Sequence, residues 1–422
     1  MGYGDQPYDR FVSGVEAYSV TGEALRVERS EGPRWKLGHQ ATTVGKVQYE
    51  VDIARMEKEI LSAADSSRRR PRYLSLLGYS VFGYVEGLEE APVSLQAEGL
   101  DSWPIFLTLK PTETQDRGRA EATAVNFYAL ADSQIAMGPA LVVRRAPSKA
   151  PMFLATYDEL GGLNAVMDRV AREAAYAMDA VAEYFGTTPF PHYTVQMEML
   201  RPVSTDHRYG FSMEHMESAT FYLGEEMALN PGTQEAIWRR HRFNFAHHMA
   251  HAWIPKRSYP SGYFPFSWEL TPVLDTIWLS EGWAQYAAMS ALRDKLEPAQ
   301  REAFMKTSLD RFQAVLGNSP AFLKRMPLVE LSRVGSTRYS EDFRVGRLLF
   351  SRGGLMAEEM DRHIVSQTQG KKSFRDALRA LVAWSLRERK PFRVEDLPSL
   401  FREATGAEVG PVIQRWLAPL KE

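Results

Sequence analysis

The sequence predicts a multidomain α+β protein with a β-rich N-terminal region and a mainly helical C-terminal region. At 422 residues the chain is longer than one ordinary domain, so two or three domains are expected. About 150 residues at the start alternate polar and apolar side chains between Gly and Pro turns, which is typical of strands. From about Asp158 the apolar period changes to about 3.6 residues, which is typical of helices.

Composition excludes several classes of function. The chain is 44% hydrophobic and 25% charged, as in soluble globular proteins, and its net charge of −2 predicts no binding to nucleic acid. It has no cysteine, which excludes disulfides, thiolate catalysis and Cys-ligated zinc. The most apolar window, residues 73–85, is too short and too rich in Gly, Ser and Tyr for membrane insertion.

The compartment is predicted from two weaker features. The N-terminus "MGYGDQPYDR" lacks the cationic start and apolar run of a signal peptide. The absence of cysteine suits an oxidising compartment, where stray thiols are a liability. A cytosolic protein can also lack cysteine, so the compartment stays open, with a preference for an extracytoplasmic protein whose signal peptide is absent from this sequence.

The N-terminal elements are predicted from period-two patterns. Strands are expected within residues 14–28, 46–54, 73–85, 92–99 and 103–111, and again within 120–145, where a short helical turn also fits. The basic run "SSRRRPR" (residues 66–72) lies between two of them. Because the whole chain is not basic, we interpret this run as a solvated loop rather than an anion-binding or partner-binding patch.

The later elements follow the helical period. Residues 163–186 form an amphipathic helix ended by Gly186, and the strand-like segment 192–200 follows it. Residues 233–254 are expected to form a helix that begins at Thr233 as N-cap and ends before Pro255. Further helices are expected at 274–296, 341–367 and 373–389. The predicted domains are 1–155, 156–295 and 296–422.

The stretch "HHMAH" carries the first chemical signal. His247 and His251 are four residues apart, so on a helix both imidazoles point from one face and can share one Zn²⁺. In the next helix, Glu281 lies in the apolar segment "IWLSEGWAQY" and needs a partner if it is buried. A metal is one such partner and an arginine is another, so the residues alone leave zinc open.

Several motifs together resemble a known family. "HHMAHAWIPKR" is followed by "WLSEGWAQY", in which Glu281 comes thirty positions after His251, and the two segments together are similar to the glycyl-aminopeptidase-like branch of the gluzincin zinc metallopeptidases. That branch pairs a His-Glu-x-x-His-x-Trp helix with a Trp-Leu-x-Glu-Gly segment at this separation. "YGFSMEHMES" resembles its substrate-binding stretch, and "LLFSRGG" to "QGKKSF" resembles the segment that contains its catalytic tyrosine.

The resemblance covers most of the chain and implies a fold and a site. The fold would be an N-terminal β-domain, a thermolysin-like zinc-site domain at 156–295 and a C-terminal helical lobe. No PDZ-like module, often found at the C-terminus of this branch, is evident before Glu422. By position, His247, His251 and Glu281 would bind Zn²⁺, and Glu214 would bind the free α-amino group of a peptide. His215 would shape the site beside Glu214.

Three positions depart from the family pattern on the catalytic side. His248 replaces the glutamate general base, whose loss costs about 10²–10⁴-fold in rate. Phe350 replaces the tyrosine that donates to the oxyanion, a contribution of about 3 kcal/mol at comparable sites. Phe211, with Ser212, replaces glycines of the substrate loop and is expected to narrow the cleft.

The sequence therefore predicts an aminopeptidase-type scaffold that binds zinc and a peptide or protein N-terminus, with impaired or lost hydrolysis. One alternative is an active zinc aminopeptidase that uses His248 or Glu217 as its base. Tyr339 carries a hydroxyl near Phe350 in the sequence, but its spacing does not match the family tyrosine. Another alternative is a metal-free structural or interaction protein in which the histidines pair with acids.

Overall fold

The N-terminal region of the computed structural model is built from small antiparallel sheets. The model describes residues 6–39, 43–100, 102–264, 272–339 and 342–420. A three-stranded sheet has the order β2 (Ala24–Leu25), β1 (Val12–Ser19), β5 (Val44–Val51), and β3 (Val27–Arg29) pairs with β4 (Trp35–Leu37). A five-stranded sheet has the order β10 (Asp116–Arg117), β9 (Pro104–Leu107), β12 (Gln134–Met137), β7 (Tyr73–Leu77), β6 (Arg68–Arg70). The last pair is β11 (Arg119–Ala124) with β8 (Val93–Glu98).

Short helices join these strands: η1 (Tyr8–Phe11), α1 (Ile53–Glu59), η2 (Ala63–Asp65), α2 (Gly78–Val81) and α3 (Phe127–Ala131). The window 73–85, expected to hold one or two strands, forms strand β7 and then helix α2.

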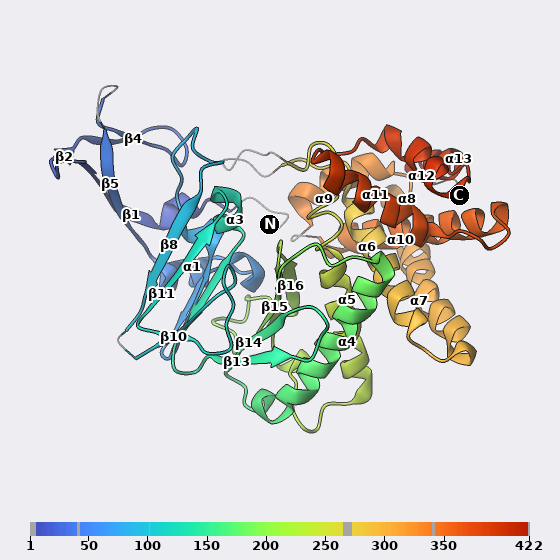
Figure 1. Ribbon diagram of the computed structural model, residues 1–422, viewed down its shortest axis with the longest axis horizontal. Helices are drawn as coiled ribbons and strands as arrows, with labels where there is room; N and C mark the ends of the chain where they lie inside the picture. The colour runs from blue at the N-terminus through green and yellow to red at the C-terminus, as the bar shows by residue number, and fades with distance from the viewer. Residues whose placement is uncertain (1–5, 40–42, 101, 265–271, 340–341, 421–422) are drawn as a thin grey trace.

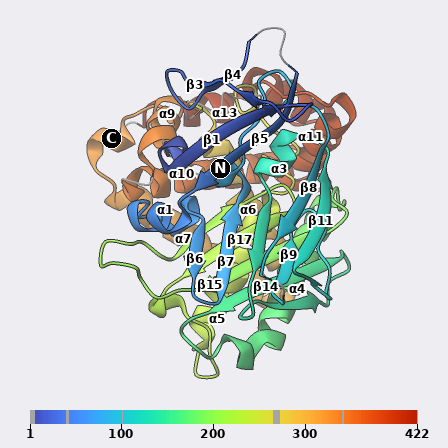
Figure 2. The same ribbon diagram turned by 90° about the vertical axis from the view of Figure 1, so that its left-hand side faces the viewer.

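A second five-stranded sheet forms the centre of the molecule. Its order is β13 (Val142–Ala146), β14 (Met152–Asp158), β15 (Tyr193–Met199), β17 (Ser218–Leu223), β16 (Phe211–Glu214). β14, β15 and β17 run parallel, whereas β13 and β16 are antiparallel edge strands. Figures 1 and 2 show the sheet between the N-terminal strands on one face and helices α4 (Met167–Phe185) and α5 (Glu235–Ala250) on the other. One apolar core lies under α4 and α5, and a smaller one joins the two sheets.

The C-terminal region is helical and is coloured orange to red in Figure 1. It follows α6 (Ile277–Asp294), which packs on α4, α5 and the longest helix, α10. Its helices are α7 (Pro298–Asn318), α8 (Ala321–Lys324), α9 (Leu328–Arg338), α10 (Phe343–Gln367), α11 (Phe374–Glu388), α12 (Leu397–Thr405) and α13 (Gly410–Leu417). Short 3₁₀ turns occur at η3 (Leu163–Val166), η4 (Glu225–Met227) and η5 (Val394–Asp396). In the described part of the chain, none of the helices has the length and apolar character that a membrane crossing needs.

The predicted order of a β-rich region followed by a helical region is confirmed, while the boundaries after residues 155 and 295 stay predictions. Gly186 ends α4 in the left-handed conformation, as expected. The N-cap prediction at Thr233 is wrong: Gln234 precedes α5, and the Thr233 hydroxyl instead donates to the Ala228 carbonyl. α5 also ends earlier than expected, at Ala250, so His251 is its C-cap, although its backbone is still helical.

The interpretation of residues 66–72 as a solvated loop is wrong. Arg68–Arg70 forms β6, and Arg68 is 1% exposed because its charge is paired inside the protein. Its guanidinium lies 2.7 Å from Glu198 Oε2 on β15, donates to the Ser66 carbonyl at 2.8 Å, and lies over the Tyr222 ring. Through the ion pair of Arg68 with Glu198, the basic run therefore connects the N-terminal sheet to the central sheet.

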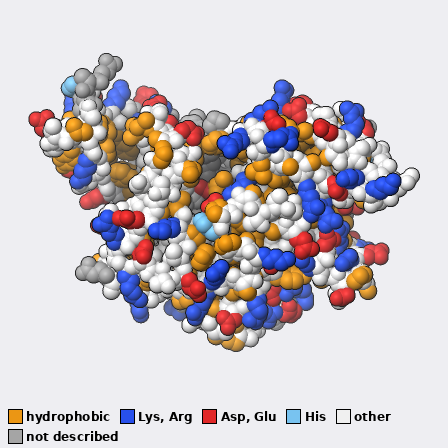
Figure 3. All heavy atoms as spheres, in the orientation of Figure 1, with side chains coloured by type: hydrophobic (Ala, Val, Ile, Leu, Met, Phe, Trp, Pro, Cys, Tyr) orange, Lys and Arg blue, Asp and Glu red, His pale blue; other side chains and the backbone are white. Residues whose placement is uncertain are grey.

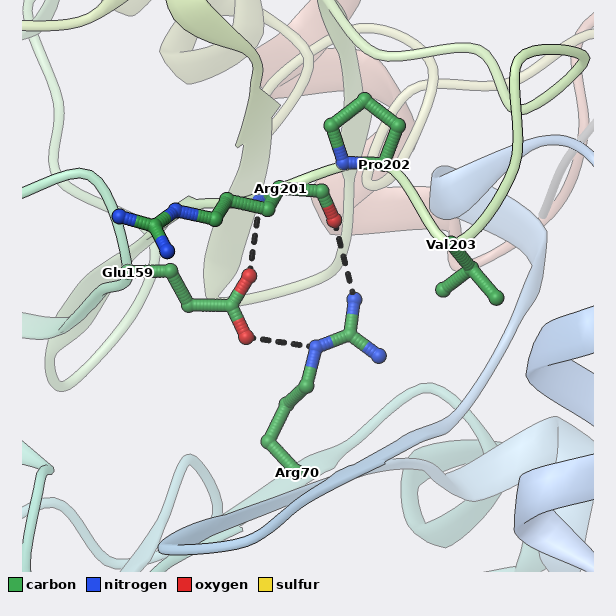
Figure 4. Close-up of a pocket in the computed structure, with 5 residues that line it drawn as sticks. All are labelled: Arg70, Glu159, Arg201, Pro202 and Val203. Carbon is green, nitrogen blue, oxygen red and sulfur yellow. Dashed lines mark hydrogen bonds and ion pairs between the residues drawn. The ribbon is translucent and has the colours of Figure 1, made fainter.

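Arg70 makes a second set of ion pairs nearer the surface, which also connects the N-terminal sheet to the central region. Figure 4 shows a pocket in which its Nε donates to Glu159 at 2.6 Å, while the other Glu159 oxygen accepts from the Arg201 backbone N–H at 2.7 Å. Arg70 is also ion-paired with Glu57. Because the charges in this pocket neutralise one another, we assign it no ligand.

Two glycines set the position of α6 against α10. A Cβ on Gly353 would lie 1.9 Å from the Trp278 carbonyl oxygen, and a Cβ on Gly282 would lie 2.4 Å from the Cα of Gly353. The two helix backbones therefore touch, which side chains at these positions would prevent. This contact holds Glu281, the neighbour of Gly282, beside α10.

Arg68→Met is expected to lower the free energy of unfolding by about 3–5 kcal/mol, because it leaves the Glu198 carboxylate buried and unpaired. Denaturant unfolding measures this change. Arg119→Met removes an exposed pair with Glu121 and should change stability by less than about 1 kcal/mol. An effect of Arg68→Met no larger than that of Arg119→Met would contradict the fastening role.

Gly353→Ala is expected to destabilise the fold by about 1–3 kcal/mol or more, since the new methyl group overlaps the Trp278 carbonyl. Gly317→Ala is a matched control within α7, because a Cβ there meets nothing within 4 Å. Urea unfolding of both variants checks the prediction. Equal stability of the two would show that the backbones can separate at little cost.

Candidate metal centre

The structure brings together three residues that the sequence analysis proposed as metal ligands. His247 and His251 come from the end of α5, and Glu281 comes from the first turns of α6. The Nε2 atoms of the two histidines are 3.3 Å apart, and Glu281 Oε2 lies 3.3 Å from His247 Nε2 and 3.4 Å from His251 Nε2. All three side chains are buried.

These distances fit a tetrahedral zinc ion. With bonds of about 2.0–2.1 Å, two ligand atoms of four-coordinate Zn²⁺ are about 3.3–3.4 Å apart. His251 Nδ1 lies 3.1 Å from the Ile254 carbonyl oxygen, which favours a proton on Nδ1 and a lone pair on Nε2. Within the described part of the chain, His247 Nδ1 makes no hydrogen bond.

The charges of the cluster act on one another. Burial, and next the neighbouring His251, lowers the pKa of His247 to about 4, so this imidazole is neutral near pH 7. Burial alone would lower the pKa of His251, but the negative charges of Glu214 and Glu281 raise it. Burial alone would raise the pKa of Glu281, but His251 and the hydrogen bonds from both imidazoles lower it to about 2. Glu281 is therefore an ionised carboxylate, as a metal ligand must be.

Glu214 lies next to this cluster, at the end of the edge strand β16. It is 6% exposed, and one of its oxygens, His251 and Glu281 offer donor atoms within 4.8 Å of one another. Its Oε2 is 3.7 Å from Nδ1 of His248, the residue at the position of the family base. His215, the next residue in the chain, is turned away toward Asp132, with its Nδ1 3.1 Å from Asp132 Oδ1.

Phe350 and Phe211, two further substituted positions, are connected through the rings of Tyr339 and Phe343. Phe350 is 6.0 Å from the His247 ring and 5.9 Å from the Tyr339 ring, measured between centroids. The Tyr339 ring also contacts the Phe343 ring. The centroid of the Phe343 ring lies 5.1 Å from that of the Phe211 ring. Phe211 thus reaches from β16 to the first residue of α10 beside the cluster.

Sequence reasoning undervalued Tyr339 and missed Asp132 and Lys256. Tyr339 ends α9, and Gly346 on α10 leaves room for its ring, a packing relation that spacing does not reveal. Asp132 precedes its partner His215 by 83 residues and matches no motif. Burial alone would lower the pKa of Lys256, but Tyr263, Asp132 and the two glutamates raise it, so Lys256 is a cation near the site.

Glu217, expected from the sequence as a possible variant base, is engaged elsewhere. It lies 3.3 Å from Arg257 and 3.5 Å from His192. Figure 3 shows a histidine side chain at the surface between the N-terminal and helical regions, with acidic and basic side chains near it.

Comparison with known proteins shows that the chain is similar in fold to solved structures of peptidases. Residues 2–139 match the Peptidase M61 N-terminal domain. An aminopeptidase N family protein from Idiomarina loihiensis superposes with a TM-score of 0.84 at 16% identity, over 100% of this chain and 70% of that one. An M1 zinc metallopeptidase from Deinococcus radiodurans gives 0.60 at 16% identity, over 97% and 84%. A search of curated proteins finds no match.

These likenesses confirm the predicted family resemblance at the level of fold and N-terminal domain. The roles of the individual site residues stay predictions. Residues 2–139 therefore resemble the Peptidase M61 N-terminal domain, and the chain shares its fold with the solved structures of an aminopeptidase N family protein and an M1 zinc metallopeptidase.

Proposed function

We propose that the protein is an aminopeptidase-type zinc metallopeptidase scaffold that binds zinc and peptide but has impaired or lost peptide hydrolysis. The observation that carries the proposal is the spacing of three buried donors, 3.3 to 3.4 Å apart, from His247, His251 and Glu281. Zinc in this site would supply Lewis-acid chemistry to a bound carbonyl group. The donor set and its spacing support zinc rather than magnesium or calcium, which prefer oxygen ligands.

The proposed ligand is a peptide or protein N-terminus. A related structure is described as an M1 zinc metallopeptidase mutant of Deinococcus radiodurans bound to a Tyr-Ser-Ala substrate, with 16% identity to this chain. In the present protein Glu214 offers a buried carboxylate to an α-ammonium group. It ends the edge strand β16, which among the described strands pairs only with β17 and could pair with an extended peptide on its other side.

The loss of hydrolysis is inferred from what the site residues can do chemically. No carboxylate stands at position 248, and an imidazole beside a dication holds a proton poorly. Phe350 places a ring 6.0 Å from His247 but has no hydroxyl to donate. Phe211 packs against Phe343, so a large ring stands where the family loop has glycine, which we expect to narrow the space for a peptide backbone.

A second candidate is an active aminopeptidase with substituted catalytic groups. Its support is the pairing of His248 with Glu214, which could orient the imidazole as a base, and the Tyr339 ring beside Phe350. Burial, and next the charges of Glu281 and Glu214, raise the pKa of Tyr339, so its phenol stays protonated and able to donate. The metal-free alternative is supported by His251, which its carboxylate neighbours can hold as a cation.

We expect the purified protein to contain about one zinc per chain, and His247→Ala, His251→Ala and Glu281→Ala each to lose most of it. Elemental analysis after dialysis against a metal-free buffer measures this content. His241→Ala is the matched control, since this buried histidine of α5 bonds the Met227 carbonyl rather than the cluster. Wild-type protein without metal, or with metal retained in all three ligand variants, would rule out the assigned site.

Restoring the two catalytic groups should restore activity in part. His248→Glu with Phe350→Tyr is expected to raise hydrolysis of short N-terminally free peptides by about 10²-fold or more over wild type, because each group typically contributes at least that much. Fluorogenic aminoacyl substrates measure the rate, with His248→Gln and Phe350→Tyr as a control that lacks a base. Chelator-sensitive hydrolysis by wild type, lost in His248→Ala, would instead support the second candidate.

A further inference from the structure

A further protein nitrogen lies next to the two histidines of the three-donor cluster. His248 follows His247 on α5, and one ring nitrogen from each of His247, His248 and His251 lies within 4.8 Å of the others. Tetrahedral ligand atoms are about 3.3–3.4 Å apart, so the distances from the His248 nitrogen to the other two nitrogens exceed those of tetrahedral ligands by at most about 1.5 Å. A change in the side-chain torsions of one histidine covers such a distance.

Glu214 is placed to orient this imidazole. Metal-bound histidines almost always donate a hydrogen bond from their second ring N–H to a carboxylate or a backbone carbonyl. His251 has this arrangement through Ile254, at 3.1 Å, and His248 Nδ1 faces the buried Glu214 carboxylate at 3.7 Å. This distance is longer than a hydrogen bond, and a movement of the imidazole toward the metal position would change it. Nε2 is then the nitrogen of His248 left to bind a metal.

The surroundings of His248 allow this approach. Its side chain is 13% exposed and its ring lies edge-on to Phe221, with centroids 5.4 Å apart. Its ring is 4.9 Å from that of His247 and 5.9 Å from that of His251. Phe221 offers no hydrogen-bonding atom, so Glu214 and the cluster are the polar neighbours in these contacts.

From these contacts we propose that His248 is a fourth metal ligand, oriented by Glu214, which completes a closed site with His247, His251 and Glu281. The inference rests on the proposed zinc site. Structural zinc sites have four protein ligands, whereas catalytic sites keep one position open for water or substrate. The histidine at the base position would thus remove the base and also fill the open position, leaving a metal that stabilises the fold.

The proposal differs from a role of His248 as a general base. A base needs a free nitrogen and a metal with an open position, so a small anion should reach the metal. If His248 is itself a metal ligand, it occupies that position and a small anion cannot bind there. The role of Glu214 differs as well: a carboxylate that orients a metal ligand typically raises metal affinity 10–100-fold, whereas Glu214 as an amine receptor would act on that affinity only through its charge.

Cobalt-substituted protein tests the proposal directly, since the visible absorption of Co²⁺ reports coordination number. We expect the wild-type spectrum to be of the four-coordinate type and unchanged by added azide, whereas His248→Ala should bind azide with a spectral change. Zinc affinity, measured by chelator competition, should fall about 10–100-fold in Glu214→Gln and further in His248→Ala. His248→Gln keeps the side-chain volume and should behave as His248→Ala if that variant unfolds.

His363→Ala is the matched control, because this histidine of α10 bonds the Glu408 carbonyl and should leave affinity and spectrum unchanged. An azide-sensitive wild-type spectrum, or zinc affinity in His248→Ala and His248→Gln within twofold of wild type, would overturn the fourth ligand and leave the zinc site standing. Wild-type protein that binds neither metal would overturn the zinc site, and this inference with it.

Discussion

Two carboxylates buried within 4.8 Å of each other are the constraint on which the site depends. At this separation the repulsion between Glu214 and Glu281 is at least about 3 kcal/mol at an effective dielectric constant near 20. Positive charge must therefore lie close by. His251, whose pKa both carboxylates raise, and Lys256 supply some of it, and a divalent cation among the three donors would supply more. The fold has to hold these groups together against their repulsion.

Three separate packing relations do so. The contact of α6 and α10 backbones at Gly282 and Gly353 fixes Glu281 opposite the histidines of α5. The edge strand β16 delivers Glu214 from the central sheet. That sheet is in turn fastened to the N-terminal region by the buried Arg68–Glu198 pair. Because the donors come from different elements, the 3.3–3.4 Å spacing is a property of the whole central region rather than of one helix.

The sequence predicted the features that depend on periodicity and motif spacing. The order of β-rich and helical regions, the end of α4 at Gly186 and the proximity of Glu281 to His247 are of this kind. What it missed depends on long-range packing. Arg68 resembled a loop residue until Glu198, 130 positions later, was found beside it. Tyr339 had the wrong spacing for a family tyrosine, yet the crossing of α9 and α10 places its ring beside Phe350.

The substitution at position 248 changes both the charge and the partners of the site. A glutamate there would add a third carboxylate near Glu214 and Glu281 and would leave Glu214 available to an α-ammonium group. An imidazole removes that negative charge and instead faces Glu214 at 3.7 Å. An incoming amine therefore meets a less negative site and must displace His248 from the carboxylate that would bind it. Both effects oppose the binding of an ordinary aminopeptidase substrate, and both arise from one residue on the helix that carries the metal ligands.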